Sequence, residues 1–147
     1  MAATRTAEVT WSGDLASGSG VVERVGSGTF GDLGVSWAAR TEAPEGRTSP
    51  EELLAAAHAS CFAMALSAGL ARAGTPPTRM HVSAAVTFDK RDDGWRVVTS
   101  ALTVRGTVPG ATAEAFAAAA DAARTGCPIS KALAGNVELT VEASLEG

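Results

Sequence analysis

The longest apolar stretch of the chain follows Ser49, in the segment SPEELLAAAHASCFAMAL of residues 49–66. Ser49 can accept a hydrogen bond at the start of a helix, Pro50 suits the first helical position, and Glu52 stands where a capping box needs an acid. Residues that are mostly alanine and leucine then continue to Arg72, before a glycine and two prolines. The pattern predicts one long helix from Ser49 to Arg72.

Apolar and polar residues alternate both before and after this helix, which is typical of strands with one buried face. The predicted strands are residues 7–11, 21–25, 80–89, 95–106 and 136–144. An Asp-Gly pair between the third and fourth of them favours a hairpin. Residues 110–126 are alanine-rich and predict a second helix, and PISKALAG after Cys127 predicts a short third one. Residues 27–37 suggest extended chain, and residues 38–47 a polar connection.

The order of strands, long helix, hairpin, helices and strand predicts an α+β fold with antiparallel sheets. The length is that of a single domain over residues 1–147. The long helix is apolar on nearly every side and needs cover all round. One small sheet cannot supply that cover, so we expect sheets wrapped around long central helices in an intertwined homodimer.

Composition narrows the function classes. The net charge of −4 argues against nucleic acid, and no basic amphipathic stretch indicates a membrane surface. Residues 53–72 approach the length of a membrane span, but their alanine, serine and glycine content favours a buried helix. The N-terminus lacks the apolar core of a signal peptide, and with only two cysteines this points to the reducing cytoplasm.

The two cysteines, Cys61 and Cys127, carry the candidate chemistry. Cys61 stands within the long apolar helix, where a thiol has a raised pKa and is inert unless a positive partner lies nearby. Packing as a small apolar side chain is the simpler interpretation of its position. Cys127 precedes a proline at a predicted helix start, a place that favours a thiolate. It too could be a simple helix cap.

A metal site is the weaker alternative. His58 and Cys61 share a helix face, and with Cys127 and His81 they could make four ligands for zinc. Only the first pair has ligand-like spacing, however, and His58 by itself suits a hydrogen-bonded core histidine. We therefore expect no metal and no cofactor.

Two motifs resemble those of the OsmC/Ohr family of thiol peroxidases. SPEELLAAAHASCFAMAL resembles the family's cysteine helix, and GCPISKAL, residues 126–133, resembles its second-cysteine motif. The order of elements fits along essentially the whole chain. His58 stands where Ohr proteins usually carry an aromatic residue, so the sequence looks more like the OsmC branch.

The resemblance implies a peroxidase that reduces organic hydroperoxides, and hydrogen peroxide less well. Cys61 would attack the peroxide and become a sulfenic acid, Cys127 would resolve it as a disulfide, and an external thiol or dithiol would reduce that disulfide. By the same resemblance Arg40 would stabilise the thiolate and Glu51 would orient Arg40. Arg47 is the rival arginine, because the loop before the helix varies in length in the family.

Glu51 and Cys61 are ten positions apart, which is about 15 Å along one straight helix. If Arg40, Glu51 and Cys61 meet, the site therefore combines two subunits, which agrees with the homodimer that the resemblance implies. Two other functions stay open. One is a non-enzymatic protein of the same fold that binds a small apolar ligand. The other is a thioesterase-like dimer, for which the sequence marks no acid or base besides Glu51.

Overall fold

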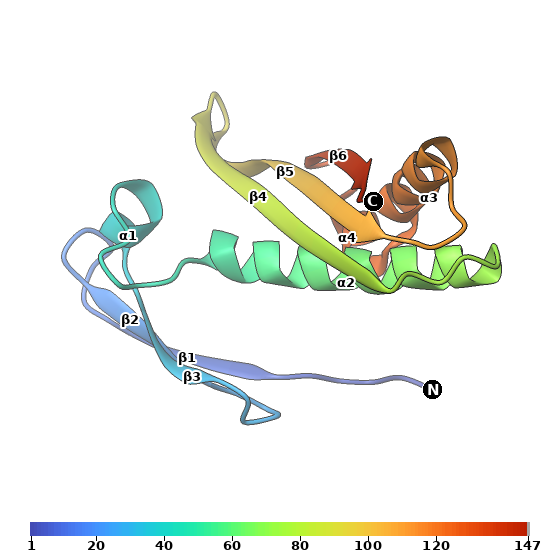
Figure 1. Ribbon diagram of the computed structural model, residues 1–147. Helices are drawn as coiled ribbons and strands as arrows, with labels where there is room; N and C mark the ends of the chain where they lie inside the picture. The colour runs from blue at the N-terminus through green and yellow to red at the C-terminus, as the bar shows by residue number, and fades with distance from the viewer. Residues whose placement is uncertain (147) are drawn as a thin grey trace. The chain divides into compact units, whose positions relative to one another are not determined.

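The computed structural model describes residues 1–146. The chain divides into two compact units, Met1–Leu53 and Leu54–Gly147, and each is described by itself. Helix α2 (Pro50–Arg72) begins at the end of the first unit and continues through the second (Figure 1). The single domain over residues 1–147 stays a prediction.

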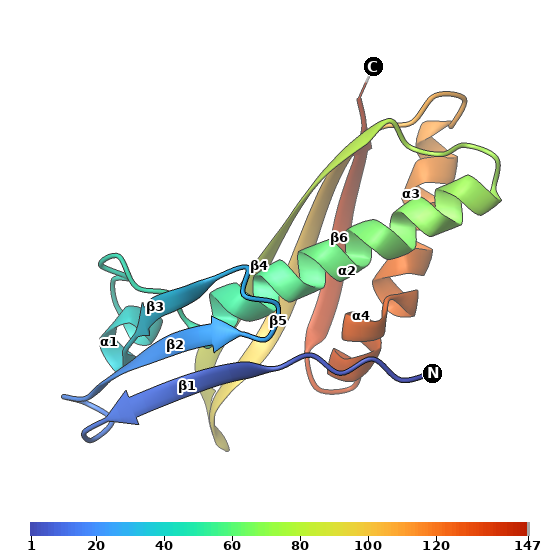
Figure 2. The ribbon, with the colours of Figure 1, turned by 90° about the horizontal axis from the view of Figure 1, so that it is seen from below.

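The first unit is built on a three-stranded antiparallel sheet, in the order β1-β2-β3 (Figure 2). Its strands are β1 (Ala7–Ser12), β2 (Ser19–Val25) and β3 (Gly31–Val35). Val9 pairs with Val22, and Val22 with Leu33, so these apolar side chains share one face. Val9 nevertheless stays 59% exposed. The sheet thus has an apolar face that its own unit covers only in part.

Helix α1 (Trp37–Thr41) follows β3, and it corrects the prediction for this region. Residues 38–47 were expected to be a polar connection, but the chain turns into a helix directly after Ser36. The Ser36 hydroxyl accepts a hydrogen bond from the backbone N–H of Ala39 at 3.1 Å, which caps the helix. Arg40 therefore projects from a capped helical turn and not from a loop.

The start of α2 confirms the predicted helix boundary. The Ser49 hydroxyl accepts a hydrogen bond from the backbone N–H of Glu52 at 3.1 Å, and Pro50 is the first helical residue. The Glu52 carboxylate accepts a hydrogen bond from the Thr48 hydroxyl, also at 3.1 Å. In a capping box Glu52 would accept from the backbone N–H of Ser49, but here it accepts from Thr48, one residue earlier. The Ser49 hydroxyl still caps the helix.

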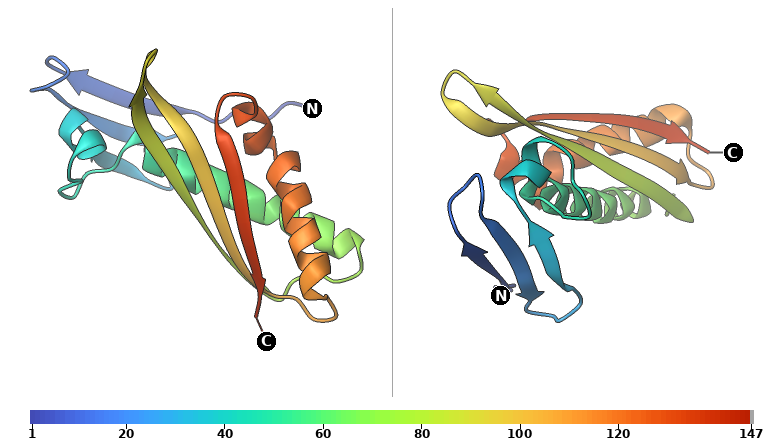
Figure 3. Two further views of the ribbon diagram at one scale, coloured as in Figure 1. Left: turned by 90° about the horizontal axis from the view of Figure 1, so that it is seen from above. Right: turned by 90° about the vertical axis from the view of Figure 1, so that its left-hand side faces the viewer.

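The second unit places helices against a sheet of three strands, in the order β4-β5-β6 (Figure 3). The strands are β4 (Arg79–Arg91), β5 (Gly94–Thr107) and β6 (Glu138–Leu145). The predicted hairpin is β4 and β5, which pair antiparallel. Strand β6 joins β5 in parallel, a pairing that the sequence did not predict. Parallel pairing needs a crossover, and α3 (Ala113–Gly126) with α4 (Pro128–Leu133) supplies it.

The core of the second unit lies between one face of α2 and the sheet. Phe62, Leu66 and Leu70 repeat every four residues and are at most 2% exposed. They belong to one cluster with Leu102, Val104, Val108, Phe116 and Ala120. A side chain at position 106 would meet the Phe116 ring, since an ideal Cβ there lies 2.7 Å from it. Gly106 therefore lets α3 approach β5.

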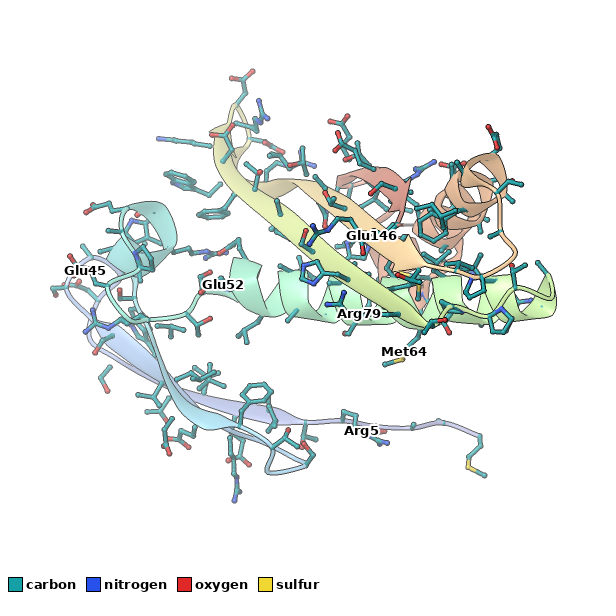
Figure 4. The ribbon with its side chains drawn as sticks, viewed as in Figure 1. Arg5, Glu45, Glu52, Met64, Arg79 and Glu146 are labelled. Carbon is teal, nitrogen blue, oxygen red and sulfur yellow. The ribbon has the colours of Figure 1, made fainter. Side chains whose placement is uncertain are left out.

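The opposite face of α2 is apolar but uncovered in this chain. Met64 is 72% exposed and points away from the β4–β5 hairpin (Figure 4). Within residues 1–146, α2 is the helix that is long and apolar enough to cross a membrane by length and composition, a test that core helices of soluble proteins also pass. An exposed methionine on a long apolar helix makes this face a candidate interaction surface.

Candidate functional site

In the first unit, Arg40 and Glu51 form a close ion pair. Arg40 Nε lies 3.0 Å and 3.1 Å from the two carboxylate oxygens of Glu51, and Arg40 Nη2 lies 2.8 Å from Oε1. The side chain of Glu51 is 9% exposed and that of Arg40 is 29% exposed. A two-point contact of this kind fixes the plane of the guanidinium as well as its position. The contact between Glu51 and Arg40 is the one that the proposed roles of these two residues require, and the roles themselves stay a prediction.

A small hollow lies beside Arg40 within the first unit. It has a volume of about 170 Å³ and is lined by Trp11, Leu15, Val35, Ser36, Trp37, Arg40 and Pro50. The Arg40 guanidinium also lies 6.0 Å from the centre of the Trp37 ring. An apolar wall beside a single cation suits a small ligand that has an apolar body and one polar end.

The rival arginine, Arg47, is placed differently. Arg47 is exposed, and the stem of its side chain lies over Gly34. Its backbone N–H donates to the carbonyl of Pro44 in a turn. The structure thus brings Arg40 to Glu51 and leaves Arg47 in the position of a solvated turn residue.

In the second unit, Cys61 and Cys127 lie in contact as free thiols. Burial raises the pKa of the Cys61 thiol, the hydrogen bond with Cys127 raises it further, and the backbone N–H of Ile129 lowers it. The net effect is a raised pKa, so Cys61 is a poor nucleophile at neutral pH without a cation beside it. This agrees with the expectation that Cys61 needs a positive partner.

Cys127 caps helix α4, as the sequence predicted. It is fully buried, and its sulfur accepts a hydrogen bond from the backbone N–H of Ser130 at 3.3 Å. The thiol of Cys127 donates to the Ser130 hydroxyl at 3.2 Å. Two contacts with one residue hold the sulfur in place at the start of the helix.

His58 lies on the buried face of α2 and bonds to two serines. Its Nδ1 is 2.7 Å from the Ser100 hydroxyl, and its Nε2 is 2.8 Å from the Ser130 hydroxyl. Burial lowers the pKa of His58, which favours the neutral ring. The sequence predicted a hydrogen-bonded core histidine, but it did not identify the partners. Ser130 stands inside the motif GCPISKAL and could have been considered, whereas nothing marks Ser100 on its strand.

The ligands considered for zinc do not gather. Both ring nitrogens of His58 have serine partners, and His81 is an exposed residue of β4. Among residues 1–146, no group of three or more histidine, cysteine or acidic side chains could hold a metal ion.

Comparisons with known proteins agree on one family. The family described as OsmC-like protein matches residues 43–142. The chain is 39% identical to Peroxiredoxin OsmC of Escherichia coli over 136 residues, which is 92% of each chain. It is 34% identical to the organic hydroperoxide resistance protein OhrA of Bacillus subtilis, covering 76% of this chain and 77% of that one. The crystal structure of OhrB of Bacillus subtilis superposes with a TM-score of 0.71 at 26% identity, covering 96% of this chain and 98% of that one.

Proposed function

Because this chain belongs to the OsmC-like protein family, we propose that it is a cysteine-based peroxidase that reduces organic hydroperoxides, and hydrogen peroxide less well. The observation that carries the proposal is the contact between the free thiols of Cys61 and Cys127. Two cysteines that are 66 positions apart in the sequence meet at one place in the fold. A peroxidase with a resolving cysteine needs this proximity.

The reaction proceeds in three balanced steps. The Cys61 thiolate attacks the terminal oxygen of the hydroperoxide, the O–O bond breaks, and an alcohol leaves after taking up a proton. Cys61 is now a sulfenic acid, and the Cys127 thiolate displaces its hydroxyl group, giving a disulfide and water. An external thiol or dithiol then reduces the disulfide and restores both thiols by exchange. We place this cycle in the cytoplasm, where such reductants are supplied.

Arg40 supplies the positive charge that Cys61 lacks. A guanidinium stays protonated throughout the working pH range, and beside a thiol it favours the thiolate. The contact with Glu51 orients the guanidinium before substrate binds. The role of Glu51 is thus to position Arg40, while Arg40 acts on the sulfur and on the peroxide oxygens.

A second copy of the chain completes the site. A helix rises about 15 Å over the ten positions between Glu51 and Cys61, which is too far for both to bound one pocket. We propose that Arg40 and Glu51 of one subunit serve Cys61 of its partner in a homodimer. The exposed Met64 face of α2 and the exposed apolar residues Val9 and Trp11 of β1 support this, since both surfaces need a cover.

The substrate class follows from the hollow beside Arg40. Its tryptophan, leucine and valine walls favour an apolar body, while the guanidinium favours the polar peroxide end. Hydrogen peroxide has no apolar body to bury there. Burial of one additional apolar group contributes about 0.8 kcal/mol per methylene, so organic hydroperoxides gain binding energy that hydrogen peroxide cannot.

The test is steady-state consumption of cumene hydroperoxide with dithiothreitol as reductant. We expect turnover by the natural chain, slower turnover with hydrogen peroxide, and none by Cys61→Ser. Turnover that survives Cys61→Ser would overturn the mechanism. Absence of turnover by the natural chain, together with saturable binding of an apolar probe, would favour the non-enzymatic binding protein.

A further inference from the structure

The network around His58 places four polar side chains in an otherwise apolar core. His58, Ser100 and Cys127 are fully buried, and Ser130 is 1% exposed. His58 comes from α2, Ser100 from β5, Ser130 from α4 and Cys127 from the cap of α4. All four belong to the second unit. The next buried residues along the same face of α2 are Phe62 and Leu66, which pack in the apolar cluster and need no polar partner. Burying hydroxyls and an imidazole costs free energy that an apolar packing of the same volume would avoid.

The network ends on the thiol that must lose a proton. Cys127 donates to Ser130 Oγ at 3.2 Å, and Ser130 Oγ lies 2.8 Å from His58 Nε2. Neutral imidazole has one N–H and one lone pair. When Ser130 donates its hydroxyl proton to Nε2, the Nδ1–H of His58 points to Ser100 Oγ at 2.7 Å. In this arrangement each step from the thiol to the ring has a donor and an acceptor.

We propose that Ser130 and His58 form a proton relay for the resolving cysteine, which serves disulfide formation and not the attack on the peroxide. This inference rests on the proposed peroxidase function. His58 is a positioning residue here, since it acts on the thiol only through the Ser130 hydroxyl. The sequence predicted His58 as a hydrogen-bonded core histidine, or more weakly as a zinc ligand, and it marked no role for Ser100 or Ser130.

The Cys127 thiol proton moves to Ser130 Oγ as the Ser130 proton moves to His58 Nε2, and the electron pair stays on the Cys127 sulfur. That sulfur attacks the sulfur of the Cys61 sulfenic acid, the S–S bond forms and the S–O bond breaks. The leaving hydroxide takes up the proton that His58 returns through Ser130. The products are the disulfide and water, and His58 is neutral again.

The need for a relay follows from where Cys127 lies. Its sulfur is fully buried, so bulk water cannot remove the thiol proton directly. Cys61 is only partly buried, and its proton can leave towards the substrate side. An internal acceptor is therefore required for one thiol and not for the other, which is why the two half-reactions should respond differently to the same substitution.

The experiment follows both half-reactions in one sample. The reduced full-length protein is mixed with one equivalent of cumene hydroperoxide without reductant and is quenched at intervals. Dimedone traps the Cys61 sulfenic acid, and intact mass separates the thiol, trapped and disulfide forms. Ser130→Ala removes the relay hydroxyl but keeps the backbone N–H that bonds to Cys127. Ser100→Ala is the matched control, because it also removes one serine bond to His58, but on the side away from the thiol.

We expect Ser130→Ala to form the sulfenic acid at the natural rate and the disulfide at least about 10²-fold more slowly, the lower end of what acid–base assistance supplies. Ser130→Thr keeps the hydroxyl and should restore disulfide formation. Ser100→Ala should retain most of the natural rate. Equal disulfide rates in the natural chain and Ser130→Ala, or equal losses in Ser130→Ala and Ser100→Ala, would overturn the relay.

A second variant separates proton acceptance from packing. His58→Ala leaves a cavity of ring size, which added imidazole can fill and added pyrazole, a far weaker base of the same shape, can also fill. Recovery of disulfide formation with imidazole but not with pyrazole supports the relay, and recovery with both contradicts it. If the natural chain forms no sulfenic acid at all, the proposed function fails as well. If it forms the disulfide normally and only the variants disagree, the relay alone fails.

Discussion

Arg40 donates two N–H groups to the carboxylate of Glu51, across eleven positions of the sequence. The contact joins the short helix α1 to the first turn of α2 within the first unit. Glu51 is nearly buried and Arg40 is partly exposed, and an ion pair of this kind gains little stability over apolar packing, so we propose that its value lies in orienting the guanidinium. We propose that the pair activates the Cys61 thiol, which its own surroundings leave protonated.

Replacement of Arg40 tests this assignment. Arg40→Met keeps the length of the side chain and removes the charge, and we expect the reaction of Cys61 with cumene hydroperoxide to slow by about 10²-fold or more. Rapid-mixing kinetics of the reduced protein measure the effect. Arg47→Met is the matched control and should react at nearly the natural rate, because Arg47 is exposed over Gly34.

Loss of Arg40 also leaves Glu51 buried without its partner, which can destabilise the fold. The double variant Arg40→Met with Glu51→Gln removes that charge and serves as the folded control. A double variant that folds and still reacts at the natural rate would show that the guanidinium is not what activates Cys61.

Removal of the resolving thiol should separate the two half-reactions. Cys127→Ser keeps a hydroxyl at the helix cap, so we expect the protein to fold and to react once with hydroperoxide. The Cys61 sulfenic acid then has no internal thiol, and excess peroxide oxidises it further to the sulfinic acid. Intact mass should show the gain of one oxygen and then of two. A variant that is oxidised no further than the natural chain would exclude Cys127 as the resolving residue.

The burial of His58 predicts an acid-sensitive fold. Burial lowers the pKa of His58 below its ordinary 6.5, so the unfolded chain binds a proton more readily than the folded one. The stabilisation is complete above pH 6.5 and is lost as the pH falls through the lower pKa of the folded state, by up to about 1.4 kcal/mol per pH unit. Urea unfolding at a series of pH values measures this slope.

His58→Gln should lose most of that slope, whereas His81→Gln should keep it, because His81 is exposed on β4. The two histidines are the only ones in the chain, which makes the pair a complete control. If the free energy of unfolding falls with the same slope in all three proteins at acidic pH, carboxylates and not His58 would be responsible for the loss of stability.

Because Met64 is exposed on the apolar helix α2, we expect the proposed homodimer to depend on this residue. Met64→Glu places a charge on an apolar surface that the partner subunit is proposed to cover, so we expect the mass in solution to fall from two chains to one. Light scattering at micromolar concentration measures it. Ala118→Glu is the control, since position 118 is an exposed site of α3 near Glu114 and Asp121. A natural chain that is already monomeric would contradict the site shared between subunits.

Much of the fold was predictable because its local signals agree. Ser49 and Pro50 start α2, a glycine and two prolines end it, and alternating residues mark the β4–β5 hairpin. Helix α1 was missed because five residues are too short for a periodic pattern, although the Ser36 cap was a usable signal. The parallel pairing of β6 depends on where the α3–α4 crossover returns the chain, which no local pattern determines.

The candidate site was predictable only as far as its motifs extend. Cys61, Cys127 and Glu51 lie in recognisable segments, and the sequence favoured Arg40 over its rival Arg47, a preference that the contact of Arg40 with Glu51 supports. Ser100 and Ser130 were not found, because a serine in a strand or a short helix is ordinary in sequence. Their contacts appear only when the fold brings them to the two nitrogens of His58.

The most direct test of the central claim is the intact mass of the reduced protein before and after one equivalent of cumene hydroperoxide, without added reductant. We expect a loss of two hydrogens within seconds, and peptide mapping should locate it to a bond between Cys61 and Cys127. An unchanged mass with both thiols still free would contradict the peroxidase cycle.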